Sequence, residues 1–319
     1  MMFGSSWMQT RRSLPAYILL AVLVIVTSFF SSAFRSGQNF ADITTQLAPL
    51  AFVAIGQTVV ILQAGIDLSV GSVVSLSTVL MALYSGNTVT STIIAVVLVC
   101  VMGILVGVLN GVGSIYFRVP SLIMTLGTEV IVKGIALYLM PAPGGAVNTG
   151  FAEALTSNFG NITVMLILTI ILYILFTFIL QKTKFGRYTY AVGGDGGDVS
   201  SARKAGIPVN RTQILGYVVC SLMGALGGLL LSANIYSGDP VIGDSFSLDS
   251  ITAVIVGGTS LLGGVGTAIG SFAGVVLISI IGNILNMWNI PSFYQYIVKG
   301  LILVTALLLY QLRARKGRS

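Results

Sequence analysis

The stretch IIAVVLVCVMGILVGVLNGVGSIYF, residues 93–117, contains no charged side chain and is apolar at most of its positions. A bilayer core accommodates an α-helix of roughly 20 such residues. Five further stretches have the same character: 14–34, 47–62, 162–180, 214–231 and 301–310. The sequence therefore predicts an all-α polytopic membrane protein.

The composition supports this class and excludes others. Of 319 residues, 55% are hydrophobic and 8% are charged, whereas soluble domains are about 25% charged. Cys100 and Cys220 both lie in apolar runs, which indicates buried thiols and not a disulfide framework. The net charge of +7 comes from basic residues at the ends of apolar runs. This pattern indicates membrane lipid as a partner and argues against nucleic acid.

The basic residues also predict how the chain crosses the membrane. Nine breaks leave ten candidate helices: 35–42, 64–69, 85–91, 118–120, 141–161, 181–212, 233–247, 262–266 and 287–292. Cytoplasmic loops carry an excess of lysine and arginine. With a cytoplasmic N-terminus, thirteen of the 16 basic residues fall on that side: Arg11, Arg12, Arg118, Lys182, Lys184, Arg187, Arg203, Lys204, Arg211, Arg313, Arg315, Lys316 and Arg318. We expect one transmembrane domain over residues 1–319, an uncleaved first helix and both termini in the cytoplasm. A re-entrant pair would leave the same hydropathy at 64–69 and 262–266.

A lone carboxylate stands in the break LQAGIDLSVGS, residues 62–72. A carboxylate in hydrocarbon costs about 2.5 kcal/mol or more, which makes an intramembrane acid a functional candidate. Asp67 with Ser69 could instead cap the helix that follows, because such side chains accept hydrogen bonds from free backbone N–H groups. A structural cap and a polar group that lines a pathway both remain open from the residues.

Three other charged residues lie within apolar stretches. Lys133 lies four positions after Glu129, which places the two on one face of a helix and predicts an ion pair between them. A coupling-ion site is the alternative, although such sites need a cluster of acids or carbonyls. Lys299 is expected to extend to the outer membrane surface.

Two glycine series predict close helix packing. Gly103, Gly107 and Gly111 recur every four residues, and Gly266, Gly270 and Gly274 do the same. Small residues at this spacing let helix backbones approach closely in a membrane. The contact could lie within the chain or between two subunits.

The residues that are missing limit the chemistry. The sequence has no histidine, which removes HExxH zinc sites, Ser-His-Asp triads and histidine proton relays. The dipeptide Gly-Lys never occurs, so the phosphate-binding motif GxxxxGK[ST] is absent as well. We expect no catalytic residues, no metal and no cofactor in this chain, and any energy from ATP must come from a partner.

The predicted cytoplasmic segment 182–211 contains six basic residues. Within it, DVSSARKAGIP predicts a short helix with Asp198 as N-cap and a stop at Gly206 before Pro208. The segment is either a solvated basic loop or a docking helix.

Five motifs together resemble the permease subunits of ribose-type ABC importers, a family that serves monosaccharides. They are IGQTVVILQAGIDLSVGSVVSLSTVLMA (55–82), VPSLIMTLGT (119–128), KTKFGRYTYAVGG (182–194), ARKAGIPV (202–209) and ITAVIVGGTSLLGGVGTAIGSFAGVVL (251–277). They occur in this order, and the similarity covers about residues 46–312.

The resemblance implies a ten-helix permease of the type II importer kind in the bacterial inner membrane. It implies a second permease subunit, identical or related, two cytoplasmic ATPase subunits that use ATP and Mg, and a periplasmic solute-binding protein. The short helix would be the coupling helix, with the ATPase-contacting residues Ser200, Ser201, Ala202, Arg203, Lys204 and Gly206. The sequence departs from the family pattern here: Gly196, Gly197 and Asp198 look inserted, and Ser200 replaces the usual acid. The identity of the ATPase therefore stays open.

In this interpretation the solute passes by alternating access. The binding protein would dock at 141–161 and 233–247, and few residues would face the solute. The candidates lie along two breaks taken with their flanking glycines, 65–71 and 257–264: Gly65, Asp67, Ser69, Gly71, Gly257 and Gly258. An ion-coupled secondary transporter, which would use Asp67 and Glu129 directly, is the alternative. Which sugar or sugar-like molecule is carried does not follow from the residues.

Overall fold

The computed structural model describes residues 4–194 and 196–316, which are almost entirely helical. Its long helices are α1 (Gly4–Phe30), α2 (Gly37–Leu62), α4 (Val89–Ile115), α5 (Ser121–Leu139), α7 (Val164–Lys182), α10 (Val209–Ile235), α12 (Ala268–Met287) and α13 (Ser292–Lys316). Six of the described helices are long and apolar enough to cross a membrane: α2, α4, α5, α7, α10 and α12. Asp195, in the glycine-rich run, and Arg318, counted above among the basic residues, lie outside the described residues.

Two shorter helices, α3 (Val70–Tyr84) and α11 (Asp244–Val256), each follow a long helix after a non-helical segment. The loops contain α6 (Thr149–Thr156), α8 (Lys184–Gly193) and α9 (Ser200–Lys204). A small antiparallel hairpin pairs β1 (Asn158–Phe159) with β2 (Ile162–Thr163). The chain is therefore a helical bundle with small elements at its ends.

Helices form at all ten predicted stretches of the described chain, namely α1 to α5, α7 and α10 to α13. The loops predicted at 141–161 and 181–212 also contain helices, because polar side chains cap their first turns. Asn148 accepts a hydrogen bond from the Phe151 N–H at the start of α6, and Thr183 accepts one from the Gly186 N–H at the start of α8. Hydropathy does not report such short amphipathic elements.

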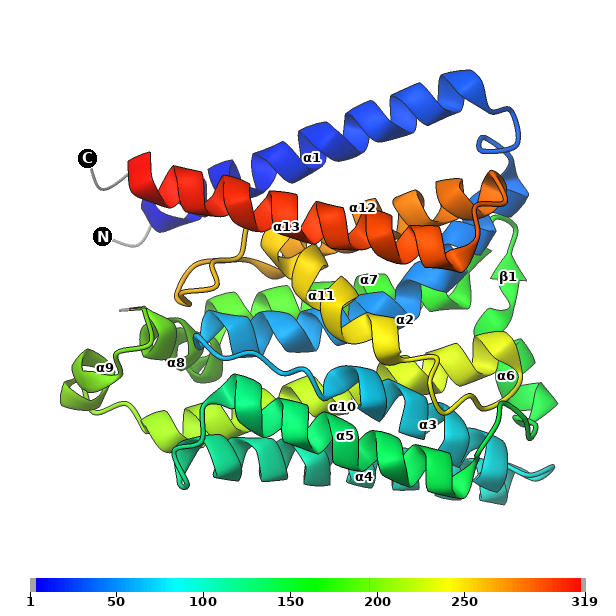
Figure 1. Ribbon diagram of the computed structural model, residues 1–319, viewed down its shortest axis with the longest axis horizontal. Coiled ribbons are helices and arrows are strands. Elements are labelled where there is room, and N and C mark those ends of the chain that lie inside the picture. The colour runs from blue at the N-terminus through cyan, green and yellow to red at the C-terminus, as the bar shows by residue number, and fades with distance from the viewer. Residues whose placement is uncertain (1–3, 195, 317–319) are drawn as a thin grey trace.

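The helices form two series that run in opposite directions (Figure 1). In each series a long helix is followed by a break, a short helix and two further helices: α2 to α5 in the first series and α10 to α13 in the second. The packing follows the same rule, since α4 lies against α10 as α12 lies against α2, and α5 lies against α3 as α13 lies against α11. The bundle is therefore built from two similar units of opposite orientation.

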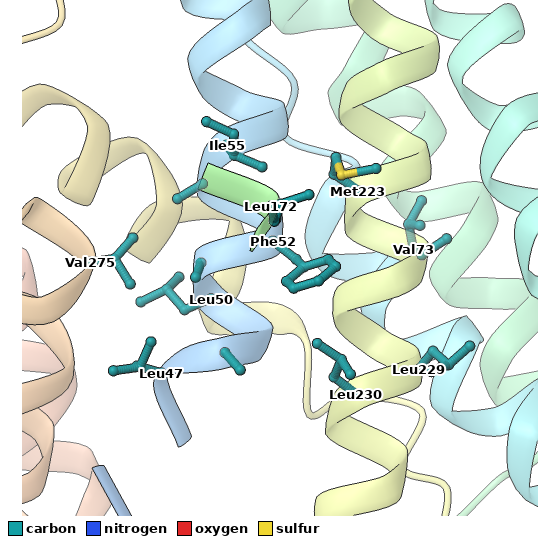
Figure 2. Packing of buried hydrophobic residues seen from close by; sticks show 14 of the residues in the cluster. Leu47, Leu50, Phe52, Ile55, Val73, Leu172, Met223, Leu229, Leu230 and Val275 are labelled. Atoms are coloured by element: carbon teal, nitrogen blue, oxygen red, sulfur yellow. The ribbon is translucent and has the colours of Figure 1, made fainter. Parts of the chain in front are cut away.

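The core lies around α2 and α10, which pack against each other (Figure 2). Leu50, Phe52 and Ile55 of α2 are buried, and so are Met223 and Leu230 of α10. Helix α2 is buried over most of its length, whereas α4, α5 and α7 leave most of theirs exposed. In a membrane protein such exposed apolar faces are suited to lipid.

Both glycine series pack within the chain. A Cβ atom on Gly107 would lie 2.5 Å from the Val218 Cα atom of α10, and one on Gly111 would lie 2.9 Å from the Ile214 Cα atom. Glycines of α12 approach α11 in the same way: a Cβ atom on Gly274 would overlap the Ala253 carbonyl oxygen. Of the two alternatives left by the sequence, these contacts fit packing inside one chain.

Candidate functional site

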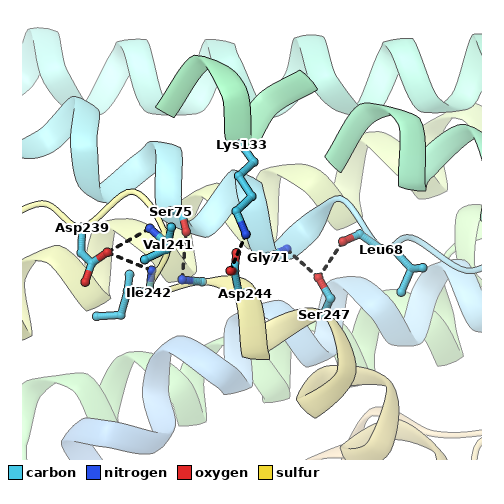
Figure 3. Close-up of polar contacts among 10 residues, drawn as sticks. Leu68, Gly71, Ser75, Lys133, Asp239, Val241, Ile242, Asp244 and Ser247 are labelled. Carbon is cyan, nitrogen blue, oxygen red and sulfur yellow. Dashed lines mark hydrogen bonds and ion pairs between the residues drawn. The ribbon is translucent and has the colours of Figure 1, made fainter. Parts of the chain in front are cut away.

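The short helices α3 and α11 both begin in the middle of the bundle (Figures 1 and 3). Their N-cap residues, Ser69 and Gly243, make no side-chain capping hydrogen bond. The first N–H groups of a helix have no partner inside that helix. In a chain that lies in a membrane, these groups need a partner from the protein itself.

Each short helix supplies that partner to the other (Figure 3). The Ser247 Oγ atom of α11 accepts a hydrogen bond from the Gly71 N–H at 3.1 Å and donates one to the Leu68 carbonyl at 2.6 Å. In return, the Ser75 Oγ atom of α3 accepts from the Gly243 N–H at 2.9 Å. This reciprocal serine exchange joins the two breaks at mid-depth.

Two glycines permit this approach. A Cβ atom on Gly71 would lie 2.6 Å from the Gly243 carbonyl oxygen, and a Cβ atom on Gly243 would overlap the Gly71 carbonyl oxygen. No larger residue fits at either position without a backbone shift. Gly71, a sequence candidate, therefore has a structural role at the crossing.

Asp67 is fully buried in the segment before α3. Its Oδ1 atom accepts from the Ser69 N–H at 2.9 Å, from the Ser69 Oγ at 2.6 Å and from the Asn110 Nδ2 of α4 at 3.4 Å. Its Oδ2 atom accepts from the Ser221 Oγ of α10 at 3.4 Å. With the Gln57 amide of α2 turned to the orientation that satisfies its neighbours, its nitrogen donates to the Asp67 carbonyl at 3.1 Å and its oxygen accepts from the Asp67 N–H at 3.3 Å. Asp67 thus connects the break to three long helices.

The predicted N-cap geometry at α3 is different in the structure. Ser69 occupies the N-cap position, and its hydroxyl donates to Asp67 instead of accepting from the first turn. Asp67 lies two residues before the cap and accepts from the Ser69 N–H, which is an Asx turn. A sequence gives the residue types near a helix start but not which of them turns toward the backbone.

The predicted ion pair between Glu129 and Lys133 is wrong. The Lys133 Nζ atom lies 2.5 Å from the Asp244 Oδ2 atom, at the start of α11 (Figure 3). Their side chains are 35% and 42% exposed. The i, i+4 rule describes neighbours on one helix, but here an acid at the N-terminus of the adjacent helix lies in reach. Asp244 in the first turn is also favoured by the helix dipole.

Lys299 also differs from the expectation that it reaches the outer surface. Its Nζ atom lies 2.6 Å from the Asp249 Oδ2 atom on the inner side of α11, with side chains 24% and 10% exposed. The two described ion pairs therefore link α11 to α5 of the first series and to α13 of the second series. The sequence analysis did not identify Asp244 and Asp249 as the partners of these lysines. The acid and serine residues of GDSFSLDS, residues 243–250, are nevertheless typical of a helix start.

Gly257 and Gly258 lie apart from the reciprocal serine exchange. Gly257 packs on the backbone of α12, where an added Cβ atom would overlap the Gly270 carbonyl oxygen, and Gly258 adopts a φ of +94°. The loop that follows meets the end of α2, since the Gly264 N–H donates to the Leu62 carbonyl at 2.9 Å. Gly65 is buried next to Tyr217, whose hydroxyl would lie 2.7 Å from an added Cβ atom. The six candidates therefore fall into two groups.

The predicted short helix is α9, Ser200–Lys204, and it ends before Gly206, which has a φ of +76°. Its N-cap is Val199 and not Asp198 as predicted. The Asp198 carboxylate accepts from the N–H and the hydroxyl of Ser200 at 2.9 and 3.0 Å. These two hydrogen bonds hold the pKa of Asp198 below its ordinary value.

One face of α9 is buried and the other is open. Ala202 is buried in a small apolar cluster with Val192 and Val209. Ser200, Ser201, Arg203, Lys204 and Gly206 are exposed. The Arg203 Nη2 atom donates to the Asn210 Oδ1 atom of α10 at 3.3 Å, so this side chain leans back toward the bundle.

Residues 39–307 match the protein family described as branched-chain amino acid transport system, permease component. The ribose import permease protein of Bacillus subtilis (strain 168) is 35% identical over 303 residues, which cover 93% of this chain and 92% of that protein. The ribose import permease protein of Escherichia coli (strain K12) is 34% identical over 314 residues, 96% and 95% of the two chains. The xylose transport system permease protein of Haemophilus influenzae is 30% identical over 363 residues, 92% and 95%. No solved structure matches the chain significantly.

Proposed function

The chain belongs to the protein family described as branched-chain amino acid transport system, permease component. We propose that, within this family, it is the permease subunit of an importer for a monosaccharide or a sugar-like solute. It is a multi-pass membrane protein, and the comparisons confirm its resemblance to ribose-type ABC permeases. Relatives named for ribose and for xylose, each 30% identical or more over nine-tenths of this chain, support a sugar as the cargo.

We place the solute pathway on the face where α5 meets the start of α11. The observation that carries this is the Lys133–Asp244 pair, which is partly exposed although many of the exposed side chains on the described helices are large and apolar. Charged groups inside a membrane face a polar cavity or a partner and not lipid, because hydrocarbon does not solvate them. The segment 65–71 would form the wall behind them, with Asp67 fixing its shape, and Gly257 and Gly258 would let α11 pivot on α12.

The proposed topology has all ten helices crossing the membrane, with both termini in the cytoplasm. The excess of basic residues on one side supports it. The location would be the bacterial inner membrane, and the whole of residues 1–319 would form one permease domain.

Transport would be driven through the segment 182–211. The exposed residues of α9 other than Arg203, which leans back toward Asn210, would contact a cytoplasmic ATPase, and the buried Ala202 would pass the movement to α8 and α10. ATP and Mg would be used by that ATPase, with no cofactor in this chain. A second permease subunit, either a copy or a relative, and a periplasmic binding protein docked at 141–161 and 233–247 would complete the importer.

Reconstitution into liposomes tests this function. The chain is purified from its native membrane with its co-purifying subunits, and uptake of labelled ribose and xylose is measured with and without ATP. We expect uptake only when the ATPase and the binding protein are present. Accumulation by the chain alone under a proton or sodium gradient would support the ion-coupled transporter and would refute the ABC assignment.

Charge reversal tests the coupling contact. Lys204→Glu on α9 should release the ATPase or abolish ATP-driven uptake while membrane insertion persists. Arg35→Glu makes the same change between α1 and α2, at the opposite end of the bundle, and should leave ATPase binding intact. Normal coupling in the Lys204 variant would contradict the assignment of α9.

A further inference from the structure

A hollow of about 430 Å³ lies where α4 ends, α9 turns and α10 begins. It is lined by Tyr116 at the end of α4, by Arg203 of α9, and by residues 207–211, which lead into the first turn of α10. It is separate from the Lys133–Asp244 face, and none of its residues takes part in the reciprocal serine exchange. The hollow lies at the ends of two long apolar helices, where a membrane surface is expected.

The hollow is lined by positively charged side chains. Arg203 reaches into it and donates to Asn210, and the exposed Arg211 stands in the first turn of α10. Among the residues that the structure describes, neither arginine is in an ion pair. No side chain caps α10 at Pro208, so the positive end of a 27-residue helix adds to the two guanidinium groups.

This arrangement suits a phosphate group. Guanidinium groups present several N–H donors in a planar fork that matches phosphate oxygens. Anions also bind at helix N-termini, because the first N–H groups point outward. Two arginines and the start of a long helix around one hollow meet both conditions.

The residues around the hollow indicate what kind of molecule would carry the phosphate. Tyr116 and Phe117 are 61% and 76% exposed at the end of α4, as is typical of residues at a membrane interface. Exposed apolar residues continue from the hollow along both helices: Ile104 and Val108 on α4, and Leu215 on α10, one turn after Arg211. They flank the seam where the glycines of α4 pack against α10. An apolar track that ends in a basic hollow fits an acyl chain joined to a phosphate.

We propose that the hollow binds the headgroup phosphate of an anionic phospholipid, between Arg203 and Arg211, with an acyl chain along the α4–α10 seam. The lipid would bridge α9 and α10 and hold the α9 turn against the bundle. This holds whichever solute is transported. An acidic side chain of a partner protein would satisfy the arginines but would leave the apolar track uncovered.

Native mass spectrometry of the full chain tests the proposal. The chain in neutral phosphatidylcholine is titrated with phosphatidylglycerol, and bound lipid is counted for the wild type and for Arg203→Gln, Arg211→Gln and the double variant. A basic residue at an anionic membrane surface contributes enough that its loss should weaken phosphatidylglycerol binding about fivefold, and the loss of both about thirty-fold. Arg187→Gln removes an equal charge from α8, outside the hollow, and should bind lipid as the wild type does.

Three outcomes would overturn the proposal. Equal weakening by Arg187→Gln would mean a diffuse charge effect, and displacement of the lipid by millimolar inorganic phosphate would mean a free-phosphate site. If Arg211→Gln lost a co-purifying ATPase with lipid binding unchanged, the hollow would belong to that protein. Arg203→Lys and Arg211→Lys keep the charge and should retain most of the binding, which separates loss of the site from loss of the fold.

Discussion

Replacement of Ser247 by alanine tests the reciprocal exchange between the two short helices. The Ser247 side chain is 3% exposed, and its hydroxyl is bonded to both the Gly71 N–H and the Leu68 carbonyl. Alanine would take that partner from both backbone groups, and each buried group left unpaired costs about 1–3 kcal/mol. The free energy of unfolding should fall by roughly 2–6 kcal/mol, which corresponds to a decrease in Tm on the order of 10 °C.

The matched control lies one turn further along the same helix. Ser250 is fully buried, and its hydroxyl donates to the Ser247 carbonyl, whose own partner lies within the helix ladder. Ser250→Ala should therefore cost less than about 1 kcal/mol. The measurement is thermal unfolding of the purified chain in detergent, followed by tryptophan fluorescence. Equal decreases in Tm for the two variants would refute the argument that the serine at 247 has a special role.

Two further predictions follow from local geometry. Gly107→Ala should destabilise the fold by about 1–3 kcal/mol, because the added Cβ atom would meet the backbone of α10. Its control is Gly134→Ala on α5, where the added Cβ atom meets nothing within 4 Å. This variant should be neutral or slightly stabilising in the same thermal assay. The pKa of Asp198 is lower in the folded chain than in the unfolded chain, so its turn is stabilised above the ordinary pKa near 3.9 and loses that support as the pH falls through the native value. The protection of the Ser200 amide against hydrogen exchange, taken as the intrinsic rate divided by the observed rate at the same pH, should therefore fall below about pH 4, and Asp198→Asn should remove most of this pH dependence. Unchanged protection across that range would contradict the role of the carboxylate.

Much of the fold follows from the sequence alone. Apolar length and the position of charges located all ten long or half-length helices of the described chain, because hydrocarbon demands continuous apolar helix. The break at 64–69 was predicted within one residue of the observed 63–69. The second break was placed at 233–247 and lies at 236–243. The Asp239 side chain accepts from the N–H groups of Val241 and Ile242, and α11 already begins at Asp244, inside the predicted break.

The site was less accessible, because it depends on which helices are neighbours. Glu129 was paired with Lys133 by spacing along one helix, yet Lys133 lies against an acid more than a hundred residues away. The candidate glycines of the two segments are indistinguishable in the sequence. In the structure, Gly71 lies at the crossing of α3 and α11, whereas Gly257 packs on α12. A glycine in a sequence does not show whether a larger side chain is excluded there, and only the tertiary arrangement distinguishes Gly107 from Gly134.

The opposed α2–α5 and α10–α13 series have a consequence for the working of the molecule. A single long helix, α7, lies between them in the chain, and the second series runs in the opposite direction to the first. In the proposed topology, the two series would therefore lie in the bilayer in opposite senses. Because the two series meet at their broken helices, a rearrangement of the first that opened the proposed pathway toward one side of the membrane would, carried out by the second, open it toward the other side.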